Sequence, residues 1–386
     1  MTRIAFAADL HVDAYGSRID PETGLNARLV DYLRTTAWVA DEARRRGAEV
    51  LVIAGDFTER RHPAPWLVSR IRSALSSFPG RQVYLRGNHD GEIAGGSIVT
   101  LLDDGFEEQD EAGRTGVNRP RLEPIAFDVV LACIPYLDRH WLRAQPGMEK
   151  VPDAEVYQVL AEQFLTIARG LYAEARADYP DAARVLVCHQ TLAGAQMSET
   201  QQAFLGDLGL VIDARALAAI GFEAVIAGHL HRHQVVLEEP CPVLYPGSVE
   251  RVDFGEEHEA KGFLVADVTP GQFAWEFVET PARRFVTLAG TSDLGRADLP
   301  ELVQGTIVRI LDVSPEDDVS NIRRDIESLE PFEITSVTQR RPDAPEIAGG
   351  LSESLGPLEA LSAYFADDPD AEPLVALGRE LLEAAA

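Results

Sequence analysis

Cysteine is scarce in this sequence of 386 residues, and lysine is scarcer still. The three cysteines, Cys133, Cys188 and Cys241, are widely spaced and form no CxxC pair. This spacing argues against a disulfide framework and against a zinc site built from cysteine, and it suits reduced thiols in a cytoplasm. Among 35 basic residues only Lys150 and Lys261 are lysine, and we draw no mechanism from that composition.

The sequence also lacks any stretch that could insert into a membrane. Its longest apolar run, around residues 129–134, is far shorter than the ~18 residues that span a bilayer. The apolar start of the chain meets a charge at Asp9, which is too early for the core of a signal peptide. We therefore expect a cytoplasmic protein whose first residues form a buried strand.

Positive charge is in short supply. Acidic residues outnumber basic ones by 63 to 35, for a formal net charge of −28, and no basic stripe interleaved with aromatics is present. The charge is uneven: residues 1–94 carry +1, residues 95–341 carry −20 and residues 342–386 carry −9. Since so negative a field repels phosphates, any nucleic-acid affinity must come from a local source of positive charge.

Short apolar runs and helix-period segments alternate over the first ninety residues, a pattern typical of βαβ units. We expect strands at residues 4–8, 50–54, 82–85, 127–134, 185–188, 224–227, 234–237, 243–245, 262–268 and 273–278. Helices are expected at residues 25–46, 64–77 and 156–171, and a loop at residues 103–121. The sequence thus predicts an α/β (α+β) fold with a β-sandwich core flanked by helices.

Three parts of the chain differ in pattern. We assign residues 1–280 to the main domain, residues 281–341 to a small α/β domain, and residues 342–386 to an acidic tail with short helices. The small domain is expected to contain a strand, a helix and a strand at residues 305–312, 315–328 and 333–338. Helix patterns in the tail cover residues 352–365 and 373–385, with an apolar stripe at Leu374, Leu377, Leu381 and Leu382. A stripe of this kind either binds a partner coiled coil or packs on its own domain.

Polar motifs follow five of the expected strands. In chain order they are Asp9-Leu10-His11, Gly55-Asp56, Gly87-Asn88-His89-Asp90, His189 and Gly228-His229-Leu230-His231. Each motif by itself is ordinary loop sequence. Because α/β sheets place their sites at the carboxyl ends of strands, the five together predict a single site.

The motifs supply nitrogen and oxygen donors, a mixture that suits Mn²⁺, Fe or Zn²⁺ rather than Ca²⁺. Seven side chains are candidate ligands: Asp9, His11, Asp56, Asn88, His189, His229 and His231. Seven exceed what one ion normally takes from a protein while leaving room for water. Two ions that lie about 3.5–4 Å apart and share a carboxylate would account for seven ligands. Such a pair could stabilise a phosphoryl-transfer reaction.

In their order, these motifs resemble those of the calcineurin-like metallophosphoesterase superfamily. The resemblance implies two metal positions bridged by Asp56, one completed by Asp9, His11 and His231 and the other by Asn88, His189 and His229. It also implies that His89 sits over the substrate phosphate, where it stabilises the transition state or protonates the leaving group. Asp90 would orient His89.

Other segments resemble one subfamily, the SbcD nucleases of the bacterial SbcCD double-strand-break processing complex. Residues 245–256, with Lys261-Gly262-Phe263, look like the segment that follows the last SbcD metal motif, and residues 189–195 and 228–234 also resemble SbcD. The likeness covers about residues 1–340 and includes a small domain that caps the active site and helps position DNA. It implies a Mn²⁺-dependent DNA nuclease, with double-strand exonuclease and single-strand endonuclease activity, that acts in DNA end processing, repair or recombination. The implied assembly is a homodimer with an SbcC-like ATPase.

Two places depart from the family pattern. Glu59 stands where relatives usually have Asp or His, and Val12-Asp13-Ala14-Tyr15 replaces a Leu-Gly continuation of the first motif. We expect altered contacts at the site there, although neither change removes a ligand. Two alternatives stay open: a phosphodiesterase for small substrates such as cyclic nucleotides, which would tolerate the acidity, and a non-catalytic scaffold, against which the complete set of motif residues argues.

Overall fold

Two six-stranded sheets form the centre of the computed structural model, which describes residues 1–93, 96–97, 114–204, 210–314, 316–339, 358, 362 and 371–384. The first sheet has the order β16 (Gln272–Glu279), β15 (Gly262–Thr269), β1 (Thr2–Ala7), β2 (Val50–Ala54), β3 (Arg81–Leu85) and β6 (Arg114–Val117). The second has the order β13 (Gln234–Leu237), β14 (Val243–Tyr245), β12 (Ala224–Gly228), β9 (Ala183–His189), β8 (Val129–Ile134) and β7 (Arg121–Ala126).

The central strands are buried on both faces. In β2, Val50, Val52 and Ala54 belong to the apolar layer between the sheets, while Leu51 and Ile53 pack with the helices outside. Strands of this kind carry continuous apolar runs rather than an alternation of apolar and polar residues. This explains why the sequence shows short, uninterrupted hydrophobic segments.

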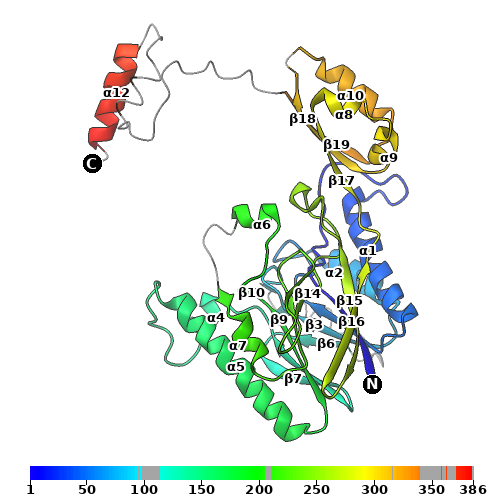
Figure 1. Ribbon diagram of the computed structural model, residues 1–386, viewed down its shortest axis with the longest axis vertical. Coiled ribbons are helices and arrows are strands. Elements are labelled where there is room, and N and C mark those ends of the chain that lie inside the picture. Colours follow the sequence, from blue (N-terminus) through cyan, green and yellow to red (C-terminus); the bar gives the residue numbers. More distant parts are fainter. Residues whose placement is uncertain are drawn as a thin grey trace. The chain divides into compact units, whose positions relative to one another are not determined.

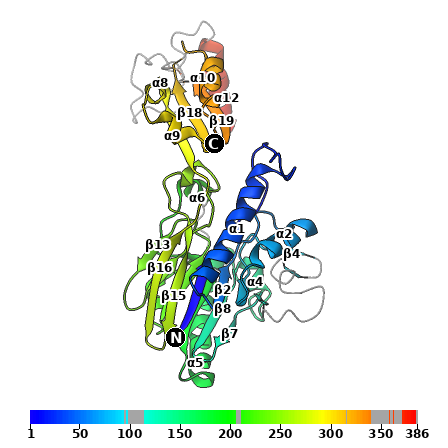
Figure 2. The ribbon, with the colours of Figure 1, turned by 90° about the vertical axis from the view of Figure 1, so that its right-hand side faces the viewer.

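Helices cover the outer face of each sheet (Figure 1). Helices α1 (Ala27–Arg45) and α2 (Pro65–Leu75) pack on the first sheet, and Figure 2 shows α1 lying along it. Helices α4 (Arg139–Arg143), α5 (Val156–Asp178) and α7 (Ala214–Ala218) pack on the second. The predicted β-sandwich flanked by helices is therefore confirmed.

Parallel strands at the middle of each sheet bring the motif loops to one edge. β1, β2, β3 and β6 run parallel in the first sheet, and β8, β9, β12 and β14 do so in the second. Around them lie the short elements β4 (Glu92–Ile93), β5 (Gly96–Ser97), β10 (Thr191–Leu192), β11 (Val211–Ile212), α6 (Glu199–Phe204) and the 3₁₀ turn η1 (Phe254–Glu256). The loops after β1, β2 and β3 therefore emerge side by side.

The chain divides into two compact units. The first comprises Met1–Val286, Leu302–Val308 and Pro331–Thr335, and the second comprises Thr287–Glu301, Arg309–Glu330 and Ser336–Ala386. Beyond the sandwich, the elements are β17 (Phe285–Ala289), α8 (Gly290–Leu294), α9 (Leu299–Val303), β18 (Ile307–Val313), α10 (Val319–Glu327), β19 (Glu333–Gln339) and α12 (Ala371–Ala384). The predicted strand, helix and strand of the small domain correspond to β18, α10 and β19. The domain boundaries at residues 280 and 341 stay a prediction.

Some predicted elements differ from the structure. Of the predicted loop, residues 103–113 lie outside the described residues, and residues 114–117 form β6 instead. The predicted strand at residues 127–134 begins only at Val129, because Phe127 and Asp128 form the turn after β7, with Phe127 99% exposed. β7 contains Pro124, which an edge strand tolerates. Most of the predicted helix at residues 352–365 falls outside the described residues, and no described helix is both long and apolar enough for a bilayer.

Candidate metal centre

All five motifs meet at one edge of the sandwich. Asp9 and His11 follow β1, Asp56 follows β2, Asn88 and His89 follow β3, His189 ends β9, and His229 and His231 follow β12. Several of these residues line one cavity of about 330 Å³, namely His11, Asp56, Asn88, His89, His229 and His231. The structure thus brings the predicted site residues together from both sheets.

The backbone of these loops adopts a conformation that side chains disfavour. Asp9, His11, Asp56 and His229 have φ angles of 53°, 42°, 54° and 98°, in the left-handed region. Such residues cost about 1–3 kcal/mol each and persist only where their surroundings impose the conformation. Here the loops restrain one another, since the N–H of Asp9 donates to the carbonyl of Gly55 and the N–H of His11 donates to that of Asp56, both at 3.0 Å.

Asp90 joins the loops after β2 and β3. Its carboxylate accepts three backbone N–H groups, those of Asp56 (2.8 Å), Phe57 (2.9 Å) and Gly87 (2.8 Å). The imidazole Nδ1 of His89 lies instead 2.8 Å from the carbonyl oxygen of Glu59. The prediction that Asp90 orients His89 is therefore wrong: the backbone of Glu59 holds the ring, and Asp90 holds the loops.

Close packing explains two motif glycines. A Cβ atom at Gly87 would lie 2.2 Å from Oδ1 of Asp56, and one at Gly55 would lie 2.2 Å from Nδ1 of His189. Any side chain at either position would push a candidate ligand out of place. Glycine at these two positions is therefore required to keep Asp56 and His189 in place.

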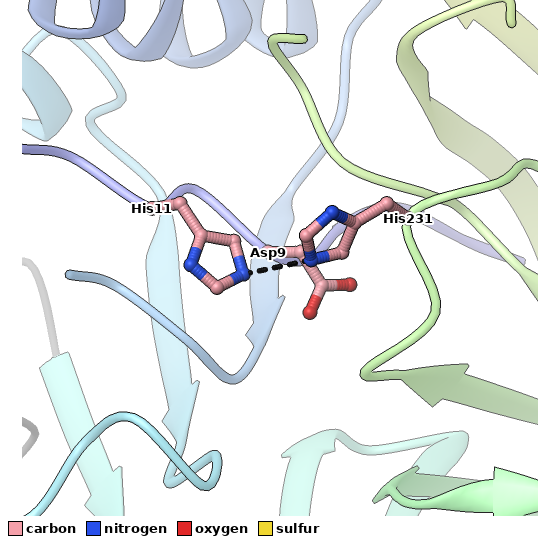
Figure 3. Close-up of side chains that lie close together, drawn as sticks. All are labelled: Asp9, His11 and His231. Carbon is pink, nitrogen blue, oxygen red and sulfur yellow. Dashed lines mark hydrogen bonds between the residues drawn. The ribbon is translucent and has the colours of Figure 1, made fainter. Parts of the chain in front are cut away.

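Asp9, His11 and His231 form the first donor group (Figure 3), with ligand atoms within 4.8 Å of one another. Nδ1 of His11 lies 2.8 Å from Oε2 of Glu59, and Nδ1 of His231 lies 2.6 Å from Oε1 of Glu256. Because carboxylates only accept, both Nδ1 atoms carry protons, and a neutral ring then presents a lone pair at Nε2.

The two Nε2 atoms of His11 and His231 lie 3.0 Å apart (Figure 3). This contact requires a proton or a cation between them. Two imidazole nitrogens that present their lone pairs to the same point could hold one ion there. The first group therefore fits a divalent metal ion.

Asp56, His189 and His229 form the second donor group, together with Asn88. Oδ1 of Asn88 lies 3.0 Å from Nε2 of His189 and 2.8 Å from Nδ1 of His229. Oδ2 of Asp56 lies 3.2 Å from Nε2 of His189 and 3.6 Å from Nε2 of His11. Asp56 thus lies between the groups, where the predicted bridging ligand belongs. His89 forms a third such group with His11 and Asp56.

Burial and neighbouring charges shift the pKa values of several donors. Burial raises the pKa of Asp9. Burial also opposes ionisation of Asp56, but His189 and the neighbouring imidazoles hold its pKa well below the usual range. Burial and the nearby His189 lower the pKa of His229 to about 3, so this ring is neutral at neutral pH and can donate a lone pair.

The two departures from the family pattern contact each other. The hydrogen bond from His11 lowers the pKa of Glu59 to about 2, which keeps its carboxylate charged. The hydroxyl of Tyr15 donates to Oε2 of Glu59 at 3.4 Å, and Arg60 forms an ion pair with Asp13 at 2.9 Å. The altered residues therefore form one connected group around His11.

Sequence reasoning missed several residues behind the ligands. Buried Glu256 holds His231, and Nζ of the fully buried Lys261 lies 2.9 Å from Oε2 of Glu256. Gln201 donates to the carbonyl of His229 at 3.0 Å and accepts the N–H of His231 at 3.3 Å. A signal was present for two of them, because Glu256 and Lys261 lie in the segments that resemble SbcD nucleases.

Comparisons with known proteins agree with this geometry. A match to the calcineurin-like phosphoesterase family covers residues 2–233. The DNA double-strand break repair protein Mre11 of Methanopyrus kandleri is 24% identical over 309 residues, which is 75% of this chain and 59% of that protein. The chain thus spans less than two thirds of that relative.

Two solved structures are similar at low identity. A dimetal phosphatase from Danio rerio is 11% identical, with a TM-score of 0.47 over 72% of this chain and 97% of that chain. The calcineurin-like phosphoesterase YfkN from Bacillus subtilis is 14% identical, with a TM-score of 0.38 over 72% of this chain and 88% of that chain.

Proposed function

Because the chain belongs to the calcineurin-like phosphoesterase family of metal-dependent phosphoester hydrolases, we propose that it is a dinuclear-metal nuclease that hydrolyses phosphodiester bonds in DNA. The observation that carries the proposal is the convergence of seven donor side chains at one edge of the sandwich, where five of them and His89 line one cavity. DNA as the substrate is supported by the similarity to a double-strand break repair protein over 75% of this chain. We further propose exonuclease activity on duplex ends and endonuclease activity on single strands, as part of DNA repair or recombination.

Two divalent ions, which we propose to be Mn²⁺, would polarise a phosphoryl oxygen and stabilise the charge of the departing one. The leaving oxygen also needs a proton, and we propose that His89 supplies it. The ring of His89 is 31% exposed, and its Nδ1 donates to the carbonyl of Glu59. Nε2 is therefore the atom that would give a proton to the leaving oxygen. The carboxylate of Glu59 lies 3.7 Å from Nδ1 of the same ring.

The net charge of −28 must be offset locally for DNA to bind. Arg60 and Arg61 are exposed and follow Glu59 directly, and the part of the chain before residue 95 is nearly neutral. Two divalent ions would add four positive charges where the phosphate must lie. We expect weak DNA affinity for the isolated chain.

A partner would supply the missing affinity. We propose an SbcC-like ATPase that binds the acidic tail, where Leu377 of α12 is 54% exposed. We also propose a homodimer, and a small domain of residues 281–341 that helps position DNA over the site. These assignments rest on the resemblance to SbcD nucleases.

A second candidate is a phosphodiesterase for small substrates such as cyclic nucleotides. The acidity of the chain favours it, and so does the cavity of about 330 Å³, which lies at the lower end of the range for small-molecule sites. The similarity to a DNA repair protein favours the nuclease.

A direct substrate comparison tests the proposal. Metal-free protein would be supplied with Mn²⁺, and the products from linear duplex DNA, closed circular duplex, circular single strands, a cyclic nucleotide and a chromogenic diester would be measured. We expect loss of linear duplex from its ends, cutting of single-stranded circles and little turnover of the cyclic nucleotide. Preferential turnover of the cyclic nucleotide would support the second candidate, and no hydrolysis with any divalent ion would contradict both.

A further inference from the structure

The two donor groups differ in what lies behind their imidazoles. In the first group a carboxylate contacts each outer nitrogen, Glu59 at His11 (2.8 Å) and Glu256 at His231 (2.6 Å). In the second group Nδ1 of His189 lies 2.7 Å from a neutral acceptor, the carbonyl oxygen of Ala54. Nδ1 of His229 faces the side-chain oxygen of Asn88 within the site itself.

Glu256 is fixed from two sides. Its Oε1 accepts from His231, while Oε2 accepts the N–H of Val252 at 2.9 Å and contacts Nζ of Lys261 at 2.9 Å. Glu256 is 2% exposed and Lys261 is 0% exposed. A carboxylate held this firmly restricts the orientation of the imidazole it contacts.

Lys261 is enclosed by acceptors. Besides Glu256, its ammonium contacts Oε2 of Glu259 at 2.9 Å and the carbonyl of His231 at 3.1 Å. A buried ammonium is tolerated only where such partners replace its lost water. The lysine therefore balances the carboxylate and also contacts the ligand residue directly.

Charge separates the two groups further. Asp9, Glu59 and Glu256 place three carboxylates in or directly behind the first group, against the one ammonium of Lys261. Among the described residues, Asp56, which lies between the groups, is the carboxylate of the second. A carboxylate behind an imidazole raises the basicity of its ligating nitrogen and fixes its tautomer. A divalent ion should therefore be held more firmly in the first group.

We propose that the two metal positions are unequal, and that Glu59 and the Glu256–Lys261 pair make the position of Asp9, His11 and His231 the tighter one. Glu59 and Glu256 are positioning residues, since they act through the imidazoles. The inference rests on the proposed dinuclear centre, but it concerns the order in which the ions bind, not the substrate.

Calorimetric titration of the metal-free chain with Mn²⁺ tests the proposal. Wild type should bind two ions with affinities at least about tenfold apart. Glu256→Gln keeps the shape and a hydrogen-bond acceptor but removes the charge, and should weaken the tighter step about 10–100-fold, the usual effect of losing such a partner. Glu59→Gln should weaken the same step, and the weaker step should stay within about threefold of wild type.

Glu259→Gln is the matched control. It removes a carboxylate that contacts Lys261 at 2.9 Å but, unlike Glu256, contacts neither His11 nor His231 through its side chain. It should leave both binding steps unchanged. Thermal unfolding would establish that each variant folds, and Glu59, which is 39% exposed, offers a variant with little risk to the core.

An independent readout is the electron paramagnetic resonance spectrum of the chain with one equivalent of Mn²⁺. Wild type should give the signal of isolated ions, and Glu256→Gln should give a mixture with spin-coupled pairs. Equal affinities in wild type, or a loss in Glu259→Gln as large as in Glu256→Gln, would overturn the inference. If the chain cleaves DNA but its two metal positions have equal affinity, the inference of unequal positions is wrong and the proposed nuclease function still holds. If the positions are unequal but no DNA is cleaved, the nuclease function is wrong and the inference still holds.

Discussion

The loops of the two sheets make different contributions to the centre. The first sheet supplies both carboxylates, the amide of Asn88, and two imidazoles, whereas the second supplies imidazoles alone, those of His189, His229 and His231. The first and second donor groups each combine residues from both sheets. Both groups are therefore complete only when the two sheets are packed together.

The loops are also fixed in different ways. Those of the first sheet are joined by backbone hydrogen bonds and by the carboxylate of Asp90. Those of the second are attached to the first: the N–H of His229 donates to Asp9 at 3.0 Å, and Nδ1 of His189 donates to the carbonyl of Ala54 at 2.7 Å. The first sheet thus provides the frame onto which the second aligns its ligands.

Asp56→Asn should have the largest effect, because this residue contacts donors from both sheets. Asparagine tolerates the left-handed backbone, so the fold should remain while the shared negative charge is lost. We expect bound Mn²⁺ to fall below two ions per chain and cleavage to fall about 10³-fold or more. Elemental analysis and initial rates check this. Two bound ions and near-normal cleavage would show that Asp56 is not shared.

His89→Ala should separate chemistry from metal binding. We expect two bound ions per chain and a loss of about 10²–10⁴-fold in kcat, the usual contribution of a general acid. Activity against a chromogenic diester with a better leaving group should fall less, because that oxygen needs no proton. A variant that loses an ion would show that His89 is a ligand of the first sheet.

The sequence predicts that these donors converge because they stand in local motifs directly after strands. Parallel strands end at the same edge, so residues directly after them converge even though Asp9 and His231 are far apart in the chain. The roles of Glu256 and Lys261 could not be read in this way, because they depend on contacts across the turn η1 that no spacing rule describes. Asp90 was misassigned for a related reason: its neighbour His89 suggested a partner, but three backbone N–H groups lay closer.

Asp90→Asn should reduce stability more than chemistry. An amide has one oxygen to accept hydrogen bonds, so at least one of the three backbone N–H groups would face an NH₂ group instead. We expect a loss of about 1–3 kcal/mol in the free energy of unfolding, measured in denaturant, with kcat of the folded fraction reduced less than in His89→Ala. If the stability is unchanged and kcat falls strongly, Asp90 does orient His89.

The smallest expected effect is a change in the rate at which a reagent labels the thiols. This rate reports on the second sheet, because Cys133 lies in β8 and Cys188 in β9. Burial raises the pKa of Cys188 to about 12 and that of Cys241 to about 11, and it also raises that of Cys133. A thiol reagent at pH 8 should react only as the sandwich opens, and Mn²⁺ should slow labelling of Cys188, which directly precedes His189. Mass spectrometry of partly labelled protein checks this. Fast labelling unaffected by metal would show that the second sheet opens independently.

The left-handed residues Asp9, His11, Asp56 and His229 place function and stability in opposition. Strain at these positions is relieved by losing the side chains that make the site, so His229→Gly should raise the melting temperature of the metal-free protein while removing a ligand. A bound ion would then offset a strain that the metal-free chain carries at its own ligands.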